Sequence, residues 1–547
     1  MVHKVLSVLT REIRGLHEAA YLLALFSLLS QVLALVRDRT FAHLFGAGPT
    51  LDAYFGAFKI PDLVFAFLAL FVSSYALVPL LSGKEKKDQG AVVGNVLFTF
   101  GIVSILAAGL LWFLLPRIAP YLFPGFSPEV LDNTILLSRI ILIQPILLGL
   151  SSIATSLLQV MRQFVIYALA PILYNVGIIV GAVFFYPLWG IPGLAWGVVF
   201  GAALHLAAQV VPILGHARHL VRPTLATLRS SIIEVAMPSM PRALALSAQQ
   251  ILLLVFTGIA SAAAVGTVSA FSFALNLQSV PLTVIGISYA VVVFPALAAL
   301  VVAGDSEGFV RELWASVRHV IFWTMPAITL VIVLRAHIVR LILGSGEFSW
   351  SDTRLTAAIL ALFAVSLISQ SVILIFSRAY YAAQKVRVPI FVNIGAAVVA
   401  AFGAYLGVFW IQHAENVRFF MESLFRVADV PGTPVLMIPF AYSVAIIGAS
   451  FAFAYLFAKE FGFEERTWHT LGTSFAASVI GAGAAYAVLQ ILGPLLPLTT
   501  TVGLLTQAAS AGAAGLVVWA LTLYLLKSQE FSEMRAVAFG KPANTVP

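Results

Sequence analysis

The chain has 547 residues, of which 61% are hydrophobic and only 10% are charged. Soluble globular chains are roughly 45–50% apolar and about 25% charged, so this composition excludes a protein that works as an enzyme in water. The chain has no cysteine, which also excludes disulfides, thiolate nucleophiles and cysteine metal sites.

Apolar stretches of spanning length recur along the whole chain. Each is long enough to cross a hydrocarbon core of roughly 30 Å at about 1.5 Å per residue. The ten-residue alternation of a membrane β-barrel is absent, so the spans must be helices. We predict an all-α membrane protein with about fourteen transmembrane helices. In chain order the predicted spans are 20–46, 51–82, 90–115, 130–161, 165–187, 192–214, 229–258, 264–300, 309–334, 354–384, 388–412, 435–459, 468–492 and 500–526.

The lysines and arginines outside these spans are distributed unequally between the two sides of the membrane. Most of them, including Lys86, Arg218 and Lys385, fall on the side of the N-terminus. The positive-inside rule therefore predicts that both termini are cytoplasmic. The net charge of +8 is then explained by loops that face lipid headgroups, and it requires no nucleic acid. We expect no cleaved signal peptide, because no small-residue cleavage signature follows the basic residues 1–20.

Two stretches of the sequence resemble each other. Residues 50–54 (TLDAY) open the second predicted span, and residues 267–271 (TVSAF) open the eighth. The same two spans end near Pro79 and Pro295. Such an offset is typical of two six-helix halves that run in the same direction, and secondary transporters often bind their substrate between such halves.

Polar residues inside predicted spans are costly in lipid, so they are candidates for function. Asp52 and Lys59 are seven residues apart, and Lys59 and Asp62 are three apart, which places all three near one helical stripe. A structural role is the alternative in each case. Asp62 would neutralise Lys59, and Arg378 would snorkel to the membrane surface. The predicted substrate-binding residues are Arg37, Asp52, Lys59, Arg242, Asn276 and Arg378.

Signatures of enzymes are scarce. The ten histidines are scattered, and no His-Glu-x-x-His pair or cluster of acids is present. No Walker-type phosphate loop occurs, so the chain does not hydrolyse ATP itself. We therefore predict a transporter without a cofactor or a metal site.

Several short motifs together resemble a known family. They are Arg37-Asp38, 44–48 (LFGAG), Asp52-Ala53, 57–61 (AFKIP), Val78-Pro79, Pro241-Arg242, Phe294-Pro295, Gly344-x-Gly346-x-Phe348, 377–382 (SRAYYA) and Val388-Pro389. This set is similar to the MurJ (also called MviN) lipid II flippases over about residues 20 to 400.

The resemblance implies the fold of the multidrug/oligosaccharidyl-lipid/polysaccharide exporters. Two six-helix lobes, residues 1–224 and 225–462, would surround a central cavity, and a C-terminal helix pair and tail would occupy 463–547. Family members usually carry Arg, Arg, Glu and Arg at four cavity positions that are uncharged here. These four are Gln31, Ala66, Leu70 and Asn276. A cavity with three fewer arginines attracts a pyrophosphate less strongly.

The resemblance predicts a flippase of the bacterial inner membrane. Its cargo would be a lipid-linked anionic peptidoglycan precursor, moved to the outer leaflet by alternating access. Its partners would be this cargo, membrane lipids and cell-wall synthesis enzymes. Three alternatives remain open: a flippase for another polyprenyl-pyrophosphate-linked glycan, a cation-coupled drug exporter, and a transport-inactive scaffold for envelope synthesis.

The one sizeable outer loop, residues 413–432, alternates apolar and charged residues. Val417, Phe420, Met421 and Leu424 lie between charges at a spacing that suits a helix in the membrane interface. A mobile loop is the alternative.

Overall fold

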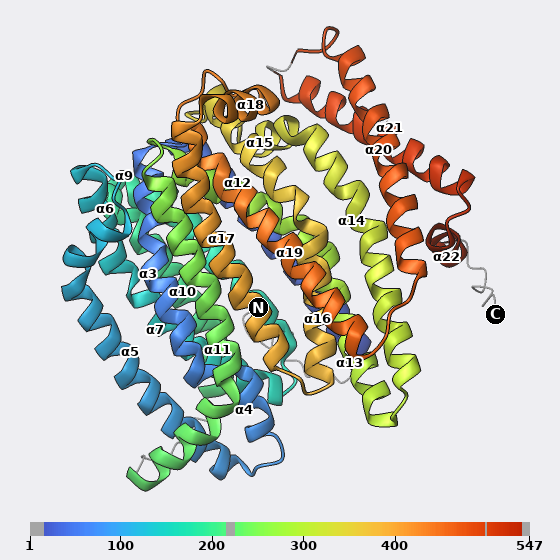
Figure 1. Cartoon of the computed structure of the whole chain (residues 1–547). Coiled ribbons are helices and arrows are strands. Elements are labelled where there is room, and N and C mark those ends of the chain that lie inside the picture. Colours follow the sequence, from blue (N-terminus) through green and yellow to red (C-terminus); the bar gives the residue numbers. More distant parts are fainter. Residues whose placement is uncertain (1–15, 215–224, 498–499, 539–547) are drawn as a thin grey trace, which may run out of the picture. The chain divides into compact units, whose positions relative to one another are not determined.

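The computed structural model describes residues 16–214, 225–497 and 500–538 (Figure 1). In these ranges every regular element is a helix, and no strand occurs. The predicted all-α fold class is confirmed. Arg218, which contributed to the predicted orientation, lies outside the described residues.

Contacts divide the chain into two compact units. Unit 1 comprises Met1–Ser269 and Ser345–Phe348, and unit 2 comprises Ala270–Gly344 and Ser349–Pro547. The lobes predicted at 1–224 and 225–462 and the helix pair and tail predicted at 463–547 stay a prediction.

The first eleven helical segments lie in unit 1. They are α2 (Leu16–Phe45), α3 (Pro49–Val72), α4 (Ser74–Leu81), α5 (Lys86–Leu122), α6 (Pro128–Ile141), α7 (Ile143–Val160), α8 (Phe164–Val180), the π-helical η1 (Gly181–Phe185), α9 (Tyr186–Trp189), α10 (Ile191–Ile213) and α11 (Leu225–Ser261).

The segments from α12 onward belong to unit 2, apart from the first residues of α12. They are α12 (Thr267–Pro281), the π-helical η3 (Leu282–Ile287), α13 (Ser288–Ala303), α14 (Ser306–Leu343), α15 (Trp350–Val365), α16 (Leu367–Ala382), α17 (Arg387–His413), α18 (Glu415–Phe425), the 3-10 helix η4 (Thr433–Leu436), α19 (Met437–Glu460), α20 (Arg466–Leu492), α21 (Thr501–Leu525) and α22 (Gln529–Ala538).

The predicted spans can be compared with these helices one by one. Within the described residues, 12 helices are long and apolar enough to cross a membrane. The pair α15 and α16, bent by 42°, is long and apolar enough when taken together, as a broken span or a re-entrant loop. The 30-residue helix α2 covers the first predicted span. Each of the fourteen predicted spans thus has a helical counterpart.

Glycines make the contact of α10 with α8 and with the adjoining η1 in unit 1. A Cβ atom added to Gly197 would lie 2.3 Å from the Cα atom of Gly181, and one added to Gly177 would lie 2.1 Å from the Cα atom of Gly201. Small residues let two membrane helices approach this closely, and the gain comes from van der Waals packing. The position of α8 therefore depends on the absence of side chains in this contact.

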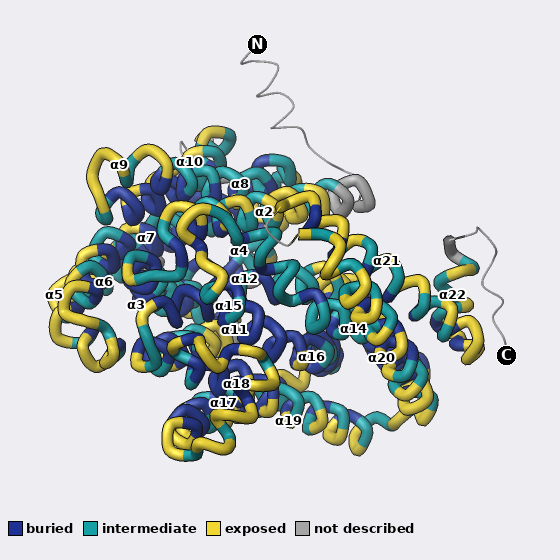
Figure 2. Tube along the Cα trace, turned by 90° about the horizontal axis from the view of Figure 1, so that it is seen from above, coloured by how far each residue is buried: buried dark blue, intermediate teal, exposed yellow. Residues whose placement is uncertain are grey.

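Aromatic rings fill the core of unit 2. Trp314 on α14 packs edge-on against Phe376 on α16, and Phe457 on α19 contacts both rings. In Figure 1, α17 and α19 run side by side, as their contacts require. The exposed residues in Figure 2 lie along the outer sides of helices such as α5, which suits a protein surrounded by lipid.

The outer loop forms a helix, α18, at Glu415–Phe425. Glu422 is buried and accepts hydrogen bonds from Arg418 and Thr433. Phe419 and Phe420 are 70% and 63% exposed. The predicted helix is confirmed, and its place in the membrane interface stays a prediction.

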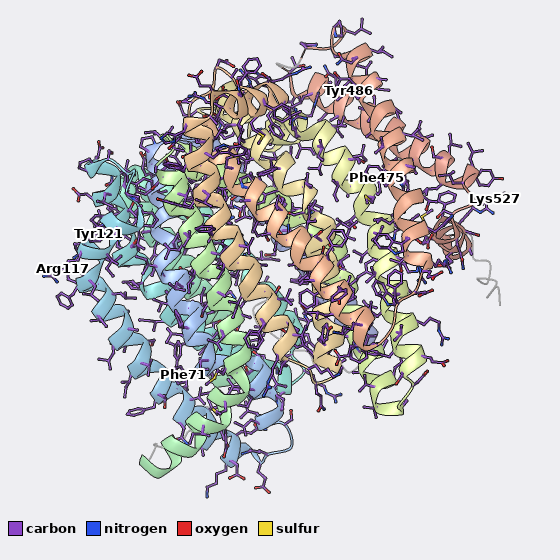
Figure 3. All side chains as sticks on the ribbon, in the orientation of Figure 1. Phe71, Arg117, Tyr121, Phe475, Tyr486 and Lys527 are labelled. Carbon is purple, nitrogen blue, oxygen red and sulfur yellow. The ribbon has the colours of Figure 1, made fainter. Side chains whose placement is uncertain are left out.

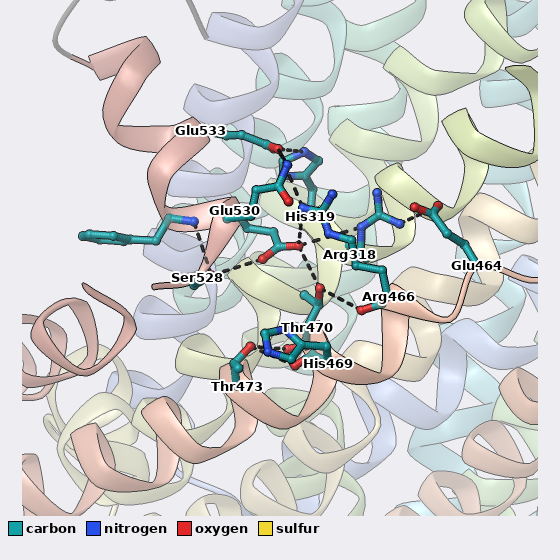
Figure 4. Close-up of polar contacts among 12 residues, drawn as sticks. Arg318, His319, Glu464, Arg466, His469, Thr470, Thr473, Ser528, Glu530 and Glu533 are labelled. Atoms are coloured by element: carbon teal, nitrogen blue, oxygen red, sulfur yellow. Dashed lines mark hydrogen bonds and ion pairs between the residues drawn. The ribbon is translucent and has the colours of Figure 1, made fainter. Parts of the chain in front are cut away.

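An ionic cluster holds the short C-terminal helix α22 against α14 and α20 of the same unit (Figure 4). The carboxylate of Glu530 lies 3.8 Å from the Nε atom of Arg318 on α14 and 3.5 Å from Arg466 on α20. Thr470 donates a hydrogen bond of 2.7 Å to it. Arg318 also pairs with Glu464 at 2.6 Å. Glu530 and Arg318 are both buried, so removing one charge leaves the others poorly compensated.

We expect Glu530→Gln to lower thermal stability at neutral pH. Burial raises the pKa of Glu530, but hydrogen bonds from Thr470 and Ser528 and the Arg466 charge outweigh it, so the pKa lies below its ordinary value. The stabilisation is therefore complete above the ordinary glutamate pKa and is lost as the pH falls through the lowered value. The variant should lose less stability than the wild type when the pH is lowered to about 3.5.

Thermal unfolding in detergent at both pH values measures this difference. Glu533→Gln is the matched control, because Glu533 lies on the same helix and its side chain is 38% exposed. Exposed ion pairs contribute about 0–1 kcal/mol. Equal effects of the two substitutions would show that burial of Glu530 does not matter.

Candidate functional site

Lys59 and Asp62 lie on α3, on either side of a proline that interrupts the helical hydrogen bonds. Pro61 has no N–H group, so it cannot bond the carbonyl of Ala57. The Ser138 hydroxyl on α6 donates to that carbonyl instead, at 3.1 Å. Because Ser138 is buried, this bond fixes the interrupted turn of α3 against α6.

Lys59 is a cation without a direct partner. Its side chain is half-buried in unit 1. Within the described residues its ammonium forms no ion pair or hydrogen bond, and Asp62 is the charge that acts on it. Asp62 is itself half-buried and accepts a hydrogen bond from Gln144 on α7. Lys59 and Asp62 form no direct ion pair in the described structure, so no such contact supports the alternative that Asp62 neutralises Lys59.

Arg37 on α2, in contrast, is held by two neighbours. Its Nε and Nη2 atoms donate to Oδ1 of Asp38 at 3.0 and 2.8 Å. Its Nη1 atom donates to Oδ1 of Asn175 on α8 at 3.1 Å. Asp38 compensates the charge, while the guanidinium keeps donors that these bonds do not use.

Asp52, near the start of α3, is fully engaged by the turn between α11 and α12. One oxygen accepts from the Gly266 N–H at 2.6 Å, and the other accepts from the N–H and the hydroxyl of Ser269 at 2.8 and 2.7 Å. Gly266 has a φ of +87°, and a Cβ atom there would lie 2.3 Å from the Ala47 carbonyl oxygen. Asp52 and Ser269 hold the same position in the two similar sequence stretches. This arrangement gives Asp52 a positioning role.

The other predicted residues lie apart from this group in the chain. Arg242 lies on α11, and its side chain is outside the described part of the structure. Asn276 and Arg378 belong to unit 2 and are half-buried. The Arg378 guanidinium lies 5.6 Å from the ring centroid of Phe294. A joint site that includes these three residues stays a prediction.

Two site residues were missed by sequence reasoning, Asn175 and Gln144. Both are uncharged amides in apolar helices, and both are buried. Asn175 follows Pro171 by four residues, and its amide donates to the Pro171 carbonyl at 3.1 Å. The available signal was a polar amide inside an otherwise apolar span.

The side chains gathered here are of the kind that can hold an anion. Among the described residues, no group of three or more His, Cys, Asp or Glu side chains could hold a metal ion. A free ammonium, a guanidinium held in place and nearby amides instead suit a phosphate-containing ligand.

Comparison with known proteins shows which family the sequence of this chain matches. The profile described as "Lipid II flippase MurJ" matches residues 41–506. The lipid II flippase MurJ of Burkholderia cenocepacia is 26% identical over 409 residues, which cover 71% of this chain and 78% of that protein.

Solved structures agree in fold. "Lipid II flippase MurJ, inward closed conformation" superposes with a TM-score of 0.73 at 20% identity, and the match covers 95% of this chain and 100% of that one. An inward-facing multidrug transporter of the MATE family matches with a TM-score of 0.63 at 15% identity, over 79% of this chain and 95% of the other. Since the family profile covers most of the sequence, the chain belongs to the MurJ family of lipid II flippases.

Proposed function

We propose that this protein moves lipid II, or a closely similar lipid-linked precursor of peptidoglycan, from the cytoplasmic to the outer leaflet of the bacterial inner membrane. The match to the lipid II flippase family over residues 41–506 carries this proposal. The half-buried, unpaired ammonium of Lys59 gives it a chemical basis, because the head of such a lipid contains an anionic pyrophosphate.

In this proposal Lys59 makes the main electrostatic contact with the pyrophosphate. A lysine inside a membrane costs at least about 2.5 kcal/mol on insertion scales, and an anionic ligand would offset that cost. Arg37 contributes hydrogen bonds with less net charge, because Asp38 already balances it. Asp52 and Asn175 hold the surrounding helices and side chains in place.

Alternating access explains how a charged head crosses while its lipid tail remains in the bilayer. Solved MATE family transporters of similar fold are described as inward-facing and as outward-facing, which supports a fold with more than one conformation. The membrane potential supplies about 2.3 kcal/mol per charge per 100 mV, so it can drive the cycle of a secondary-type carrier. Cell-wall synthesis enzymes as partners stay a prediction.

One observation favours a second cargo. Ala66 is buried and Leu70 is half-buried on α3, at positions that carry charges in the family pattern. Fewer charges weaken the attraction for a pyrophosphate. A flippase for another polyprenyl-pyrophosphate-linked glycan is therefore the second candidate.

Rescue of bacteria depleted of their own lipid II flippase tests the proposal. We expect the wild-type chain to restore growth and the normal cell shape. Lys527→Ala is the control and should rescue growth like the wild-type chain, because Lys527 is exposed and lies after the last span. A chain that is inserted at normal levels and still fails to rescue would shift the assignment to the other glycan or to a scaffold.

The proposed orientation can be tested directly, because the natural chain has no cysteine. Single cysteines at Lys86 or Lys385 should react with an impermeant maleimide only after the inner membrane is opened. Cysteines at Ser127 or Glu415 should react in cells whose outer barrier alone is permeabilised. Labelling on the opposite sides would reverse the orientation.

A further inference from the structure

A second cation that has no acidic partner among the described residues lies on α6 in unit 1. Arg139 on α6 donates from Nε to the Trp112 carbonyl oxygen on α5 at 3.1 Å. Its guanidinium carbon also lies 4.2 Å from the centroid of the Trp112 ring. Within the described residues it has no acidic partner. The two contacts fix the guanidinium plane and leave both terminal nitrogens for a ligand.

The surroundings of Arg139 face lipid. Trp112 is 43% exposed, Phe113 is 69% exposed and Tyr121 is 85% exposed. In Figure 3 the labelled side chains of Arg117 and Tyr121 project from the outer side of α5. Exposed tryptophan and tyrosine are typical of the zone where lipid headgroups meet the hydrocarbon core.

The depth of Arg139 agrees with that zone. It follows Pro128, the first residue of the span Pro128–Val160, by eleven residues, or about 16 Å. The whole span of 33 residues is about 50 Å long, and the hydrocarbon core is only about 30 Å thick. With both ends of the span protruding, the arginine lies a short distance below the interface. Helical side chains tilt toward the N-terminus, so Arg139 extends toward that interface.

An acid lies above Arg139 on the same side of α6. Asp132 is exposed and precedes Arg139 by seven residues, which places it on the same helical stripe. It is about 10 Å nearer the end of the helix, and the long arginine side chain covers part of that separation. The surface therefore presents a cation below and an anion above, at the level of the headgroups.

We propose that Arg139, Trp112 and Asp132 bind the headgroup of a zwitterionic aminophospholipid from the surrounding leaflet. The terminal nitrogens of Arg139 bind the lipid phosphate in the bidentate geometry that guanidinium groups favour. Asp132 accepts hydrogen bonds from the primary ammonium. A purely anionic lipid satisfies only the arginine, so this pair of charges selects phosphatidylethanolamine over phosphatidylglycerol. The site does not depend on the proposed cargo.

Native mass spectrometry of the delipidated full-length protein tests this site. Phosphatidylethanolamine and phosphatidylglycerol with identical acyl chains are titrated, and the apparent Kd of the first bound lipid is measured. Arg139→Gln should weaken binding of phosphatidylethanolamine about tenfold, which corresponds to the loss of one charge-assisted contact. Asp132→Asn should remove the preference for phosphatidylethanolamine while binding of phosphatidylglycerol is retained or increases.

Arg117→Gln is the matched control, because it removes the same charge from an exposed position on α5. Arg117 follows Trp112 by about one and a half helical turns. Equal losses for the two arginine variants would show general electrostatic attraction and would overturn the site. Displacement of the lipid by inorganic phosphate or by glycerophosphoethanolamine would assign the site to a soluble phosphate. Tighter binding of a polyprenyl diphosphate would assign it to the cargo. Unchanged thermal stability of Arg139→Gln confirms that a loss of binding is local.

Discussion

Replacing Lys59 with alanine should reduce transport by about tenfold to a hundredfold, which is the effect of losing one hydrogen-bonded charge contact with the cargo. The ammonium has no direct partner in the described structure, so its removal breaks no internal ion pair. Thermal stability and the amount of protein in the membrane should therefore stay close to wild type. The measurement is the rate of cargo transfer at matched protein levels.

The double variant Lys59→Ala/Asp62→Ala separates binding of cargo from internal charge balance. If Lys59 serves the cargo, transport by the double variant stays as low as that of Lys59→Ala, because the ligand contact is still missing. Restored transport would mean that the lysine only balances Asp62. Arg37→Ala is a useful comparison, and we expect a smaller loss because Asp38 already compensates that arginine.

Replacing Gly197 with leucine should prevent accumulation of folded protein. The new side chain would meet the backbone of Gly181, whose Cα atom lies 2.3 Å from the position of the added Cβ. Overpacking of a filled core typically costs about 1–3 kcal/mol, and here two helix backbones would have to separate. Membrane levels and the thermal midpoint in detergent measure the effect.

Gly109→Leu is the control for this substitution. Gly109 lies on α5 with open space around the position of its Cβ atom, so a leucine there should be tolerated. A normal thermal midpoint for Gly197→Leu would contradict the close contact of α10 with α8 and η1.

The helices were predictable from the sequence because the solvent dictates them. A backbone inside lipid must satisfy its own hydrogen bonds, so apolar length alone predicted the spans. Interruptions within the spans were less visible. The bend between α15 and α16 and the π-helical turn η1 depend on packing against neighbouring helices. No periodic pattern of apolar residues in the sequence marks them.

The site was only partly predictable for a related reason. Intramembrane charge directed attention to Lys59 and Arg37, since such charges are costly without a partner. The pattern could not distinguish a free cation from a neutralised one. Asp52 looked like part of the same stripe as Lys59, yet its carboxylate bonds the turn at Gly266 and Ser269, more than 200 positions away in the chain. Long-range partners such as Asn175 for Arg37 emerge only when the helices are placed together.

Transport by the purified protein is the most direct test of its proposed role. Liposomes that contain the protein and a headgroup-labelled lipid II are exposed to an impermeant reductant, and the loss of label from the inner leaflet is followed with time. The proposal predicts faster loss with the wild-type chain than in protein-free liposomes, and a protein-dependent rate lowered about tenfold to a hundredfold with Lys59→Ala. A wild-type rate equal to that of empty liposomes, under conditions where another polyprenyl-linked glycan is moved, would contradict lipid II as the cargo.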